Sequence, residues 1–321
     1  MDSFGRVIDY LRISVTDRCN EKCLYCMPEG YKGWAQKSDH LSADEIITVV
    51  EGACAMGFRK FRLTGGEPLI RHDIVEIARR IWELPGTQTL GISTNGTRLA
   101  SHAQALKQAG VRSVNISLDA LTPSLYRTIT GGDVALVLKG IEAALSAGFE
   151  VIKLNCVLMR GMNEAELWPL VLFAAEHGLL MRFIELMPLS SSDVLKEENF
   201  LSVQDAMRMI EQRDTLIPLP DYRPGHGPAR YYQLAASGTR IGFIGALTNP
   251  HFCETCNKLR LTADGKLRPC LGRHGEIDLL SMLRSDRDIL EGIAEAIAGK
   301  PENHEFSNCY EPGRPMTAIG G

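Results

Sequence analysis

Short apolar runs rich in β-branched residues alternate with longer amphipathic stretches through the first two-thirds of the chain. Alternation of this kind predicts strands separated by helices, and therefore a parallel α/β sheet. Six of the short runs have the length and composition of strands. We predict strands at residues 11–15, 60–64, 90–94, 113–118, 152–158 and 181–187.

A glycine follows each of four helical stretches and precedes the next strand by a few residues; these are Gly57, Gly110, Gly148 and Gly178. Glycine is favoured there because a left-handed residue ends many helices. The spacing is typical of repeated barrel units, but six strands are too few for a closed eight-stranded barrel. We therefore expect an α/β fold built on an incomplete (β/α)6 TIM-like barrel.

The pattern changes near residue 218, where the stretch LPDYRPGHGPARYY is rich in Pro and Gly and long helical periodicity stops. We expect two domains: a barrel over residues 1–220 and a C-terminal domain over residues 221–321. In parallel barrels the active site gathers at the carboxyl ends of the strands. The candidate segments are therefore those that follow the predicted strands, among them a cysteine-rich loop, GGEPL, TNG and SLDAL.

The charge balance does not indicate a particular class of partner. The chain has 35 Lys and Arg against 39 Asp and Glu, a net charge of −4, which gives no indication of nucleic-acid binding. No apolar run approaches the roughly 18–20 residues of a membrane span, and residues 1–14 lack the apolar core of a signal peptide. We therefore expect a cytoplasmic protein with no membrane partner. Nine cysteines in a reducing compartment indicate metal or redox chemistry rather than disulfides.

Cys19, Cys23 and Cys26 lie in one loop directly after the first predicted strand. Three thiolates this close together bind iron or zinc. Cys54, the next cysteine, lies in a helical stretch, so an iron-sulfur cluster held here has one iron without a protein ligand. The amino and carboxylate groups of a methionine-derived cofactor can chelate that iron. A zinc site completed by His40 is the alternative.

Cys253, Cys256 and Cys270 form a second group of three, with two and then thirteen residues between them. A zinc ribbon that uses Cys309 or His251 as its fourth ligand is one interpretation. A second cluster with an open iron is the other. Spacing alone does not choose between them.

Five segments carry a resemblance to a known family: TDRCNEKCLYCMP, LTGGEPLIR, ISLDAL, NPHFCETCNKLRLTADGKLRPCL and GRPMTAIGG. The cysteine loop and the GGE stretch resemble the radical S-adenosylmethionine superfamily. All five segments together resemble its GTP 3′,8-cyclase family, the molybdenum cofactor biosynthesis A proteins, from Arg12 to Gly321. The resemblance implies a lyase that cyclises GTP to (8S)-3′,8-cyclo-7,8-dihydroguanosine 5′-triphosphate, the first step of molybdenum cofactor biosynthesis. It also implies two 4Fe-4S clusters, with S-adenosylmethionine on the first and GTP at the second, which the C-terminal domain carries.

The same resemblance assigns residues to roles. The implied cluster ligands are Cys19, Cys23, Cys26, Cys253, Cys256 and Cys270. The implied contacts to S-adenosylmethionine are Tyr25, Gly65, Gly66, Glu67, Ser117 and Met187. The implied contacts to GTP are Arg12, Arg62, Thr94, Lys153, Arg182, Lys258, Leu259 and Arg260. The implied catalytic residues are Cys19, Cys23, Cys26, Arg260, Gly320 and Gly321.

The residue types fit these roles on physical grounds. Without side chains at Gly65 and Gly66, the backbone can approach a ligand's amino group closely. Cations on successive strands of a buried sheet need anionic partners, and a triphosphate supplies several negative charges. Lys258 departs from the family, which commonly has Arg at this position. The single ammonium of lysine replaces the planar guanidinium of arginine there, so we expect altered GTP affinity at most.

The resemblance also implies partners: an external one-electron donor such as flavodoxin, cyclic pyranopterin monophosphate synthase as the next pathway enzyme, and a second copy of the chain in a homodimer. Two other functions stay open at this point. Radical enzymes that modify peptides also append cysteine-rich C-terminal domains. A non-enzymatic binding module with two zinc sites would lose its fold in the presence of a chelator.

Overall fold

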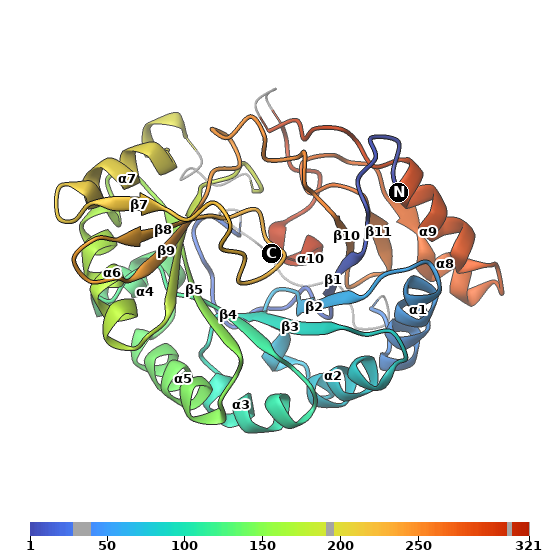
Figure 1. Cartoon of the computed structure of the whole chain (residues 1–321). Helices are drawn as coiled ribbons and strands as arrows, with labels where there is room; N and C mark the ends of the chain where they lie inside the picture. The colour runs from blue at the N-terminus through green and yellow to red at the C-terminus, as the bar shows by residue number, and fades with distance from the viewer. Residues whose placement is uncertain (28–39, 191–195, 307–309, 321) are drawn as a thin grey trace.

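One sheet of twelve strands forms the centre of the computed structural model, which describes residues 1–27, 40–190, 196–306 and 310–320 (Figure 1). Its strand order is β12-β11-β10-β1-β2-β3-β4-β5-β6-β9-β8-β7. The six central strands are parallel and are β1 (Tyr10–Ser14), β2 (Lys60–Thr64), β3 (Thr89–Thr94), β4 (Ser113–Ser117), β5 (Val151–Leu158) and β6 (Leu180–Glu185). Each differs from a predicted strand by no more than two residues at either end. The predicted parallel α/β sheet is therefore confirmed.

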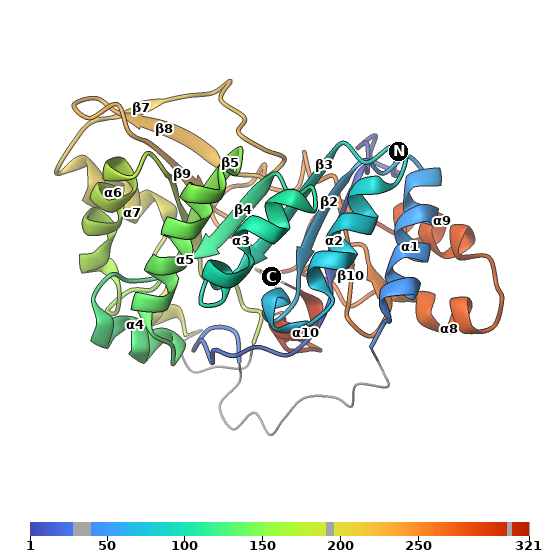
Figure 2. The same cartoon turned by 90° about the horizontal axis from the view of Figure 1, so that it is seen from below.

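Helices cover the outer face of this sheet, and Figure 2 shows α2, α3 and α5 side by side there. The long helices are α1 (Ala43–Ala55), α2 (Ile74–Glu83), α3 (Leu99–Gln108), α5 (Val134–Ala147) and α6 (Leu167–Glu176). Shorter ones are α4 (Pro123–Thr130), α7 (Val203–Glu211) and the 3-10 turns Pro68–Ile70, Glu164–Glu166 and Glu197–Asn199. Helix α1 begins at a capping box, in which Ser42 and Glu45 each accept the other's backbone N–H. No described helix is long and apolar enough to cross a membrane.

The C-terminal part of the chain extends the sheet at both edges. β9 (Arg240–Ile244) pairs in parallel with β6, and β10 (Lys258–Leu261) pairs in parallel with β1. The antiparallel strands outside them are β7 (Leu216–Pro218), β8 (Arg230–Leu234), β11 (Lys266–Arg268) and β12 (Ile277–Asp278). The remaining helices are α8 (Leu279–Arg284), α9 (Ile289–Ala298) and α10 (Met316–Ile319). One sheet thus passes through both predicted domains, and a boundary near residue 220 stays a prediction.

Side chains alternate between the two faces of each strand, and this separates an apolar outer layer from a polar interior. On β1, Leu11 and Ile13 are buried in the main core under the helices. Tyr10, Arg12 and Ser14 take the opposite face. The apolar layer supplies the burial that stabilises the fold, so the interior is left to carry polar and charged groups.

The four glycines predicted to end helices all have positive φ, which confirms that prediction: 94° at Gly57, 92° at Gly110, 69° at Gly148 and 63° at Gly178. Their surroundings differ. A Cβ at Gly110 would lie 2.0 Å from Cγ of Trp82, whereas a Cβ at Gly148 would meet nothing within 4 Å. Backbone conformation alone therefore requires glycine at 148, and both conformation and packing require it at 110.

We expect Gly148→Ala to cost about 1 kcal/mol of unfolding free energy, because only the left-handed conformation is penalised. Gly110→Ala should cost a further ~1–3 kcal/mol, since the added methyl group overlaps Trp82. Urea unfolding followed by circular dichroism measures both, with Gly148→Ala as the matched control. Equal losses in the two variants would contradict the packing role given to Trp82.

Candidate active site

The first cysteine loop, residues 16–27, follows β1 at the carboxyl end of the strand. Its backbone packs against the turn after β2. The N–H of Gly66 donates to the carbonyl of Thr16 over 2.8 Å. A Cβ at Gly65 would lie 2.3 Å from the oxygen of Thr16, and one at Gly66 would lie 2.2 Å from the oxygen of Arg18. Packing of backbone on backbone therefore requires both glycines here, in addition to the approach to a ligand that the sequence predicts.

Glu67 joins the ends of β2 and β3. Its Oε1 accepts the Thr94 hydroxyl over 2.7 Å and the Leu69 N–H over 2.9 Å, and its Oε2 accepts the Asn95 N–H over 2.7 Å. The side chain is fully buried, and burial raises its pKa to about 7. The chain's own donors thus occupy both carboxylate oxygens, and a contact of Glu67 with a cofactor stays a prediction.

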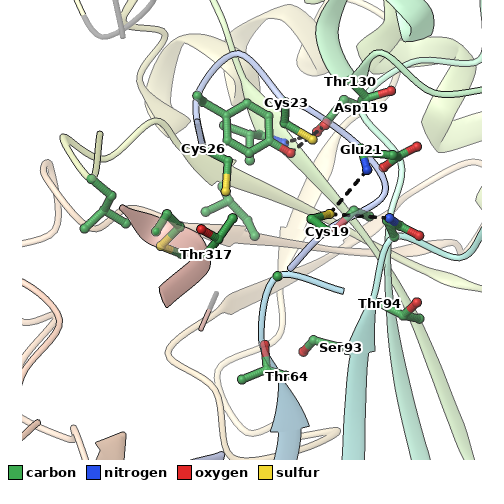
Figure 3. Close-up of a pocket in the computed structure, with 18 of the residues that line it drawn as sticks. Cys19, Glu21, Cys23, Cys26, Thr64, Ser93, Thr94, Asp119, Thr130 and Thr317 are labelled. Atoms are coloured by element: carbon green, nitrogen blue, oxygen red, sulfur yellow. Dashed lines mark hydrogen bonds between the residues drawn. The ribbon is translucent and has the colours of Figure 1, made fainter. Parts of the chain in front are cut away.

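A cavity opens between the cysteine loop and the carboxyl ends of the strands, and Figure 3 shows the side chains of Cys19, Cys23 and Cys26 around it. Five residues predicted to contact S-adenosylmethionine line the cavity: Tyr25, Gly65, Gly66, Ser117 and Met187. Thr94, predicted to contact GTP, lines the same cavity, together with Met316 and Thr317 of α10. The structure therefore brings these predicted residues together around one space.

The three thiols of this loop sit in surroundings that disfavour free thiolates. Burial raises the pKa of Cys19 and of Cys26 to about 12, and the carboxylates of Glu67 and Glu21 add to the rise at Cys19. Burial, followed by the charge of Cys26, raises the pKa of Cys23 well above its ordinary value. A thiolate here needs a positive partner, which a bound metal provides. The donor set therefore fits a metal-sulfur group.

The alternative of a zinc site at this loop gains no support from the described residues. No three His, Cys, Asp or Glu side chains among the described residues are placed to share one metal ion. A zinc site needs such a placement, whereas the cysteines of a 4Fe-4S cluster bind different irons. His40, the alternative zinc ligand, instead lies beside Asp17, with 3.2 Å between Nε2 and Oδ1.

Two buried carboxylates beside the cysteines were not predicted as site residues. The hydroxyl of Tyr25 donates to Asp119 over 2.8 Å, and the hydroxyl of Tyr126 donates to Glu21 over 2.9 Å. Burial raises the pKa of Asp119 to about 6 and that of Glu21 to about 8. Both acids lie inside motifs singled out from the sequence, but a single acid in a loop gives no local sign that it will be buried.

The second group of cysteines, Cys253, Cys256 and Cys270, lies at the opposite end of the barrel. Cys253 and Cys256 precede β10, which runs parallel to β1, and Cys270 follows the antiparallel β11. A backbone N–H beside each thiol favours its thiolate form, as N–H groups around cluster sulfurs do. In the same order, the donors are His304, Lys258 and Gly272.

Cys256 differs from its neighbours in its charge environment. Although burial opposes the effect, Lys300 and Lys258 lower the pKa of the Cys256 thiol. Burial instead raises the pKa of Cys253 and of Cys270. Thiolate formation in the second group is therefore favoured first at Cys256.

The fourth ligands considered for a zinc ribbon do not complete the second group in the described chain. His251 lies at the surface with its Nδ1 2.6 Å from Oε1 of Glu254. Cys309 lies outside the described residues. The zinc ribbon therefore gains no support from His251.

Three predicted GTP contacts stand in register across neighbouring strands, with Arg12 opposite both Arg62 on β2 and Arg260 on β10. Arg62 donates to the hydroxyl of Tyr10 over 2.7 Å. Gly91 makes room for it, because a Cβ there would lie 2.6 Å from Nη2 of Arg62. Burial, followed by the charge of Arg260, lowers the pKa of Arg12 to about 9. The interior therefore holds like charges close together.

Two more predicted GTP contacts face the same interior from β5 and β6. Lys153 donates to the carbonyl of Pro224 over 2.9 Å. Arg182 donates to the amide oxygen of Asn155 from Nε over 2.9 Å and from Nη2 over 2.6 Å. Burial, followed by the charge of Arg182, lowers the pKa of Lys153 to about 7. Both cations are thus bonded to neutral groups.

Lys258 and Leu259 divide between the two faces of β10. The ammonium of Lys258 lies 5.5 Å from the ring centroid of Tyr10 in the interior. The side chain of Leu259 is 0% exposed and packs in the main core, because alternation along the strand turns it away from the interior. A contact of Leu259 with GTP therefore stays a prediction, one that its backbone would have to make.

The C-terminal tail lies inside the barrel. The carbonyl of Gly320 accepts a hydrogen bond from Nη1 of Arg260 over 2.6 Å. A Cβ at Gly320 would lie 2.9 Å from Cγ2 of Thr64 and 3.0 Å from Cβ of Ser14. Gly320 thus contacts the inner face of β1, β2 and β10, and Gly321 lies outside the described residues.

Two family models match the chain. The Radical SAM superfamily model matches residues 13–174, and the Molybdenum Cofactor Synthesis C model matches residues 179–306. A GTP 3′,8-cyclase from Pelotomaculum thermopropionicum is 45% identical over 326 residues, which span 100% of this chain and 99% of the relative. GTP 3′,8-cyclase 1 from Pseudomonas aeruginosa is 45% identical over 320 residues, which span 97% of this chain and 95% of the relative.

Among solved structures, the crystal structure of Streptococcus suis SuiB bound to S-adenosylmethionine is similar in fold, with a TM-score of 0.62 and 15% identity. The match covers 89% of this chain and 65% of the SuiB chain, so this chain spans less than two-thirds of that protein. The superfamily implies a 4Fe-4S cluster and S-adenosylmethionine. With the full-length relatives and both matching models, the chain belongs to the GTP 3′,8-cyclase family of the radical S-adenosylmethionine superfamily.

Proposed function

We propose that this protein cyclises GTP to (8S)-3′,8-cyclo-7,8-dihydroguanosine 5′-triphosphate, the first step of molybdenum cofactor biosynthesis. One observation carries the proposal: cations line the interior of the barrel between two groups of cysteines at its opposite ends. A polyanionic substrate fits that interior, because buried cations need negative partners. Curated relatives along the full chain carry the name of this reaction.

The first group of thiols holds the radical-generating centre in this proposal. Cys19, Cys23 and Cys26 would bind a 4Fe-4S cluster, with Tyr25 and Met187 at the wall of the cavity beside it. With S-adenosylmethionine and one electron, such a centre supplies a carbon radical strong enough to take a hydrogen atom from the ribose of GTP. The protein's part is to place the ribose beside that cavity and to keep water out.

The interior cations would hold the triphosphate. Lys153 and Arg182 are bonded to a carbonyl and to an amide oxygen, both of which a phosphate can replace. Arg62 is already fixed by the hydroxyl of Tyr10, so its guanidinium is presented in a defined direction. Binding of an anion would also relieve the repulsion among these charges.

The guanine end would lie toward the second group of thiols. We propose a second 4Fe-4S cluster at Cys253, Cys256 and Cys270, each of which has a backbone N–H beside its thiol that favours the thiolate. Lys258 and Arg260 lie beside this group and would contact the nucleotide. The tail supports the same site, because the carbonyl of Gly320 already binds Arg260.

The radical step needs an electron from outside the chain, so we propose an external one-electron donor such as flavodoxin. Cyclic pyranopterin monophosphate synthase would consume the product. A cytoplasmic location and a homodimer complete the proposal, and both rest on the family to which the chain belongs.

Anaerobic reconstitution should give about eight irons per chain, four for each cluster, and 5′-deoxyadenosine should form only when GTP is present. Replacing Cys253, Cys256 and Cys270 together by Ala should halve the iron and abolish cyclisation. Iron analysis and product mass measure both results. Full iron with turnover of a peptide instead of GTP would overturn the proposed substrate.

GTP binding at pH 8 should take up close to one proton at Lys153. The pKa of Lys153 is lowered to about 7 by burial, so its free amine is largely neutral at pH 8, and a bound triphosphate favours the charged form. Calorimetry of GTP binding in buffers of different ionisation enthalpy measures the uptake. Lys153→Met should abolish it and weaken binding about 10- to 100-fold, the value of one charged hydrogen bond.

The exposed Lys139 on α5 provides the matched control, since Lys139→Met removes the same charge outside the barrel. This variant should keep both the affinity and the proton uptake of the parent. Unchanged uptake in Lys153→Met would show that another group titrates and would contradict the assignment.

A further inference from the structure

Lys300 lies in the turn after α9 and is only 3% exposed. Its ammonium donates to the carbonyl of Lys258 over 2.8 Å and to the carbonyl of Pro269 over 2.7 Å. Lys258 follows Cys256 by two residues, and Pro269 immediately precedes Cys270. One ammonium therefore ties together the two chain segments that carry these thiols.

The charge of Lys300 also acts on the thiol of Cys256 and, with the charge of Lys258, lowers its pKa. The two carbonyls accept from two of the three N–H groups of the ammonium and do not neutralise its charge. A buried ammonium is costly unless an opposite charge lies close by. An anionic cluster held by the adjacent thiols would supply that opposite charge.

The first group of cysteines has the opposite surroundings. Burial aside, the charges that act on Cys19 and Cys23 are mainly those of Glu67, Glu21 and Asp119, which are all negative. The charges that act on Cys256 are those of Lys300 and Lys258. Positively charged neighbours thus distinguish the second group.

We propose that Lys300 is a positioning residue for the second cluster, holding Cys256 as a ligand and raising the reduction potential of that cluster. The inference rests on the proposed function, since it needs a cluster at Cys253, Cys256 and Cys270. Reduction adds one negative charge to a cluster, and a buried cation bonded to the two segments that hold the cluster stabilises the reduced form. The electron comes from an added reductant, and no proton transfer is required.

The test uses the full-length chain with Cys19, Cys23 and Cys26 replaced by Ala, so that any cluster signal comes from the second group. Lys300→Met and Lys300→Gln remove the charge, and Lys300→Arg keeps it. After anaerobic reconstitution, iron content is measured and the cluster is titrated with a reductant, followed by electron paramagnetic resonance. Lys266→Met is the control, because Lys266 on β11 is an ion-paired lysine whose partner is Asp278.

We expect the Met and Gln variants to shift the one-electron equilibrium at least tenfold toward the oxidised cluster, a fall of about 59 mV in potential. The Arg and Lys266→Met variants should stay close to the parent. If Lys300→Met binds no iron, the potentials of the Gln and Arg variants test the proposal instead. Both variants retain hydrogen-bond donors, and only Arg retains the charge.

The outcomes separate the two proposals. If the parent of this series binds no cluster, the second cluster of the proposed function fails. If it binds a cluster whose potential is the same in the Gln variant, the proposed function stands and the role of Lys300 is overturned. An equal fall in the Gln and Arg variants would assign Lys300 a packing role only, and would also contradict the inference.

Discussion

Positive charges packed against one another inside the barrel are the constraint on which the rest of the structure depends. The parallel register places Arg12 between Arg62 and Arg260, and charges held this close repel one another. The apolar outer layer opposes that repulsion, because Leu11 and Leu259 of the same strands are at most 1% exposed. Neutral hydroxyls, amides and carbonyls bind the cations without cancelling their charge, so the interior keeps its attraction for anions.

The two ends of the barrel complete this interior with opposite electrostatics. At the carboxyl end, Glu21 and Asp119 lie buried near the first group of thiols. At the other end, Lys258 and Lys300 lie against Cys256. Identical thiols in such different fields acquire different chemical properties, as the different tasks that we propose for the two groups require.

Much of the fold was predictable because its signals are local. The strand alternation located β1 to β6, and the glycines at helix ends have the expected left-handed backbone. The joining of β9 and β10 to the barrel edges was not predictable, because it depends on pairing between segments far apart in the chain. The burial of Leu259 was within reach of sequence analysis, since side chains two apart share a face. No local sequence pattern indicated the burial of Lys300 or its role, because its contacts join the turn after α9 to two segments far away in the chain.

The shortness of β1 has a consequence for what the barrel can accept. This strand has five residues, and at about 3.3 Å per residue it spans roughly 16 Å. The first cysteine loop continues from its carboxyl end, and the second group of thiols lies beside its amino end. Hydrogen bonds to β2 and β10 hold the strand at both edges, so β1 fixes the distance between the two groups of thiols. For a substrate that reaches both groups, as we propose for GTP, the backbone would set the length that fits, and side chains would recognise its chemistry.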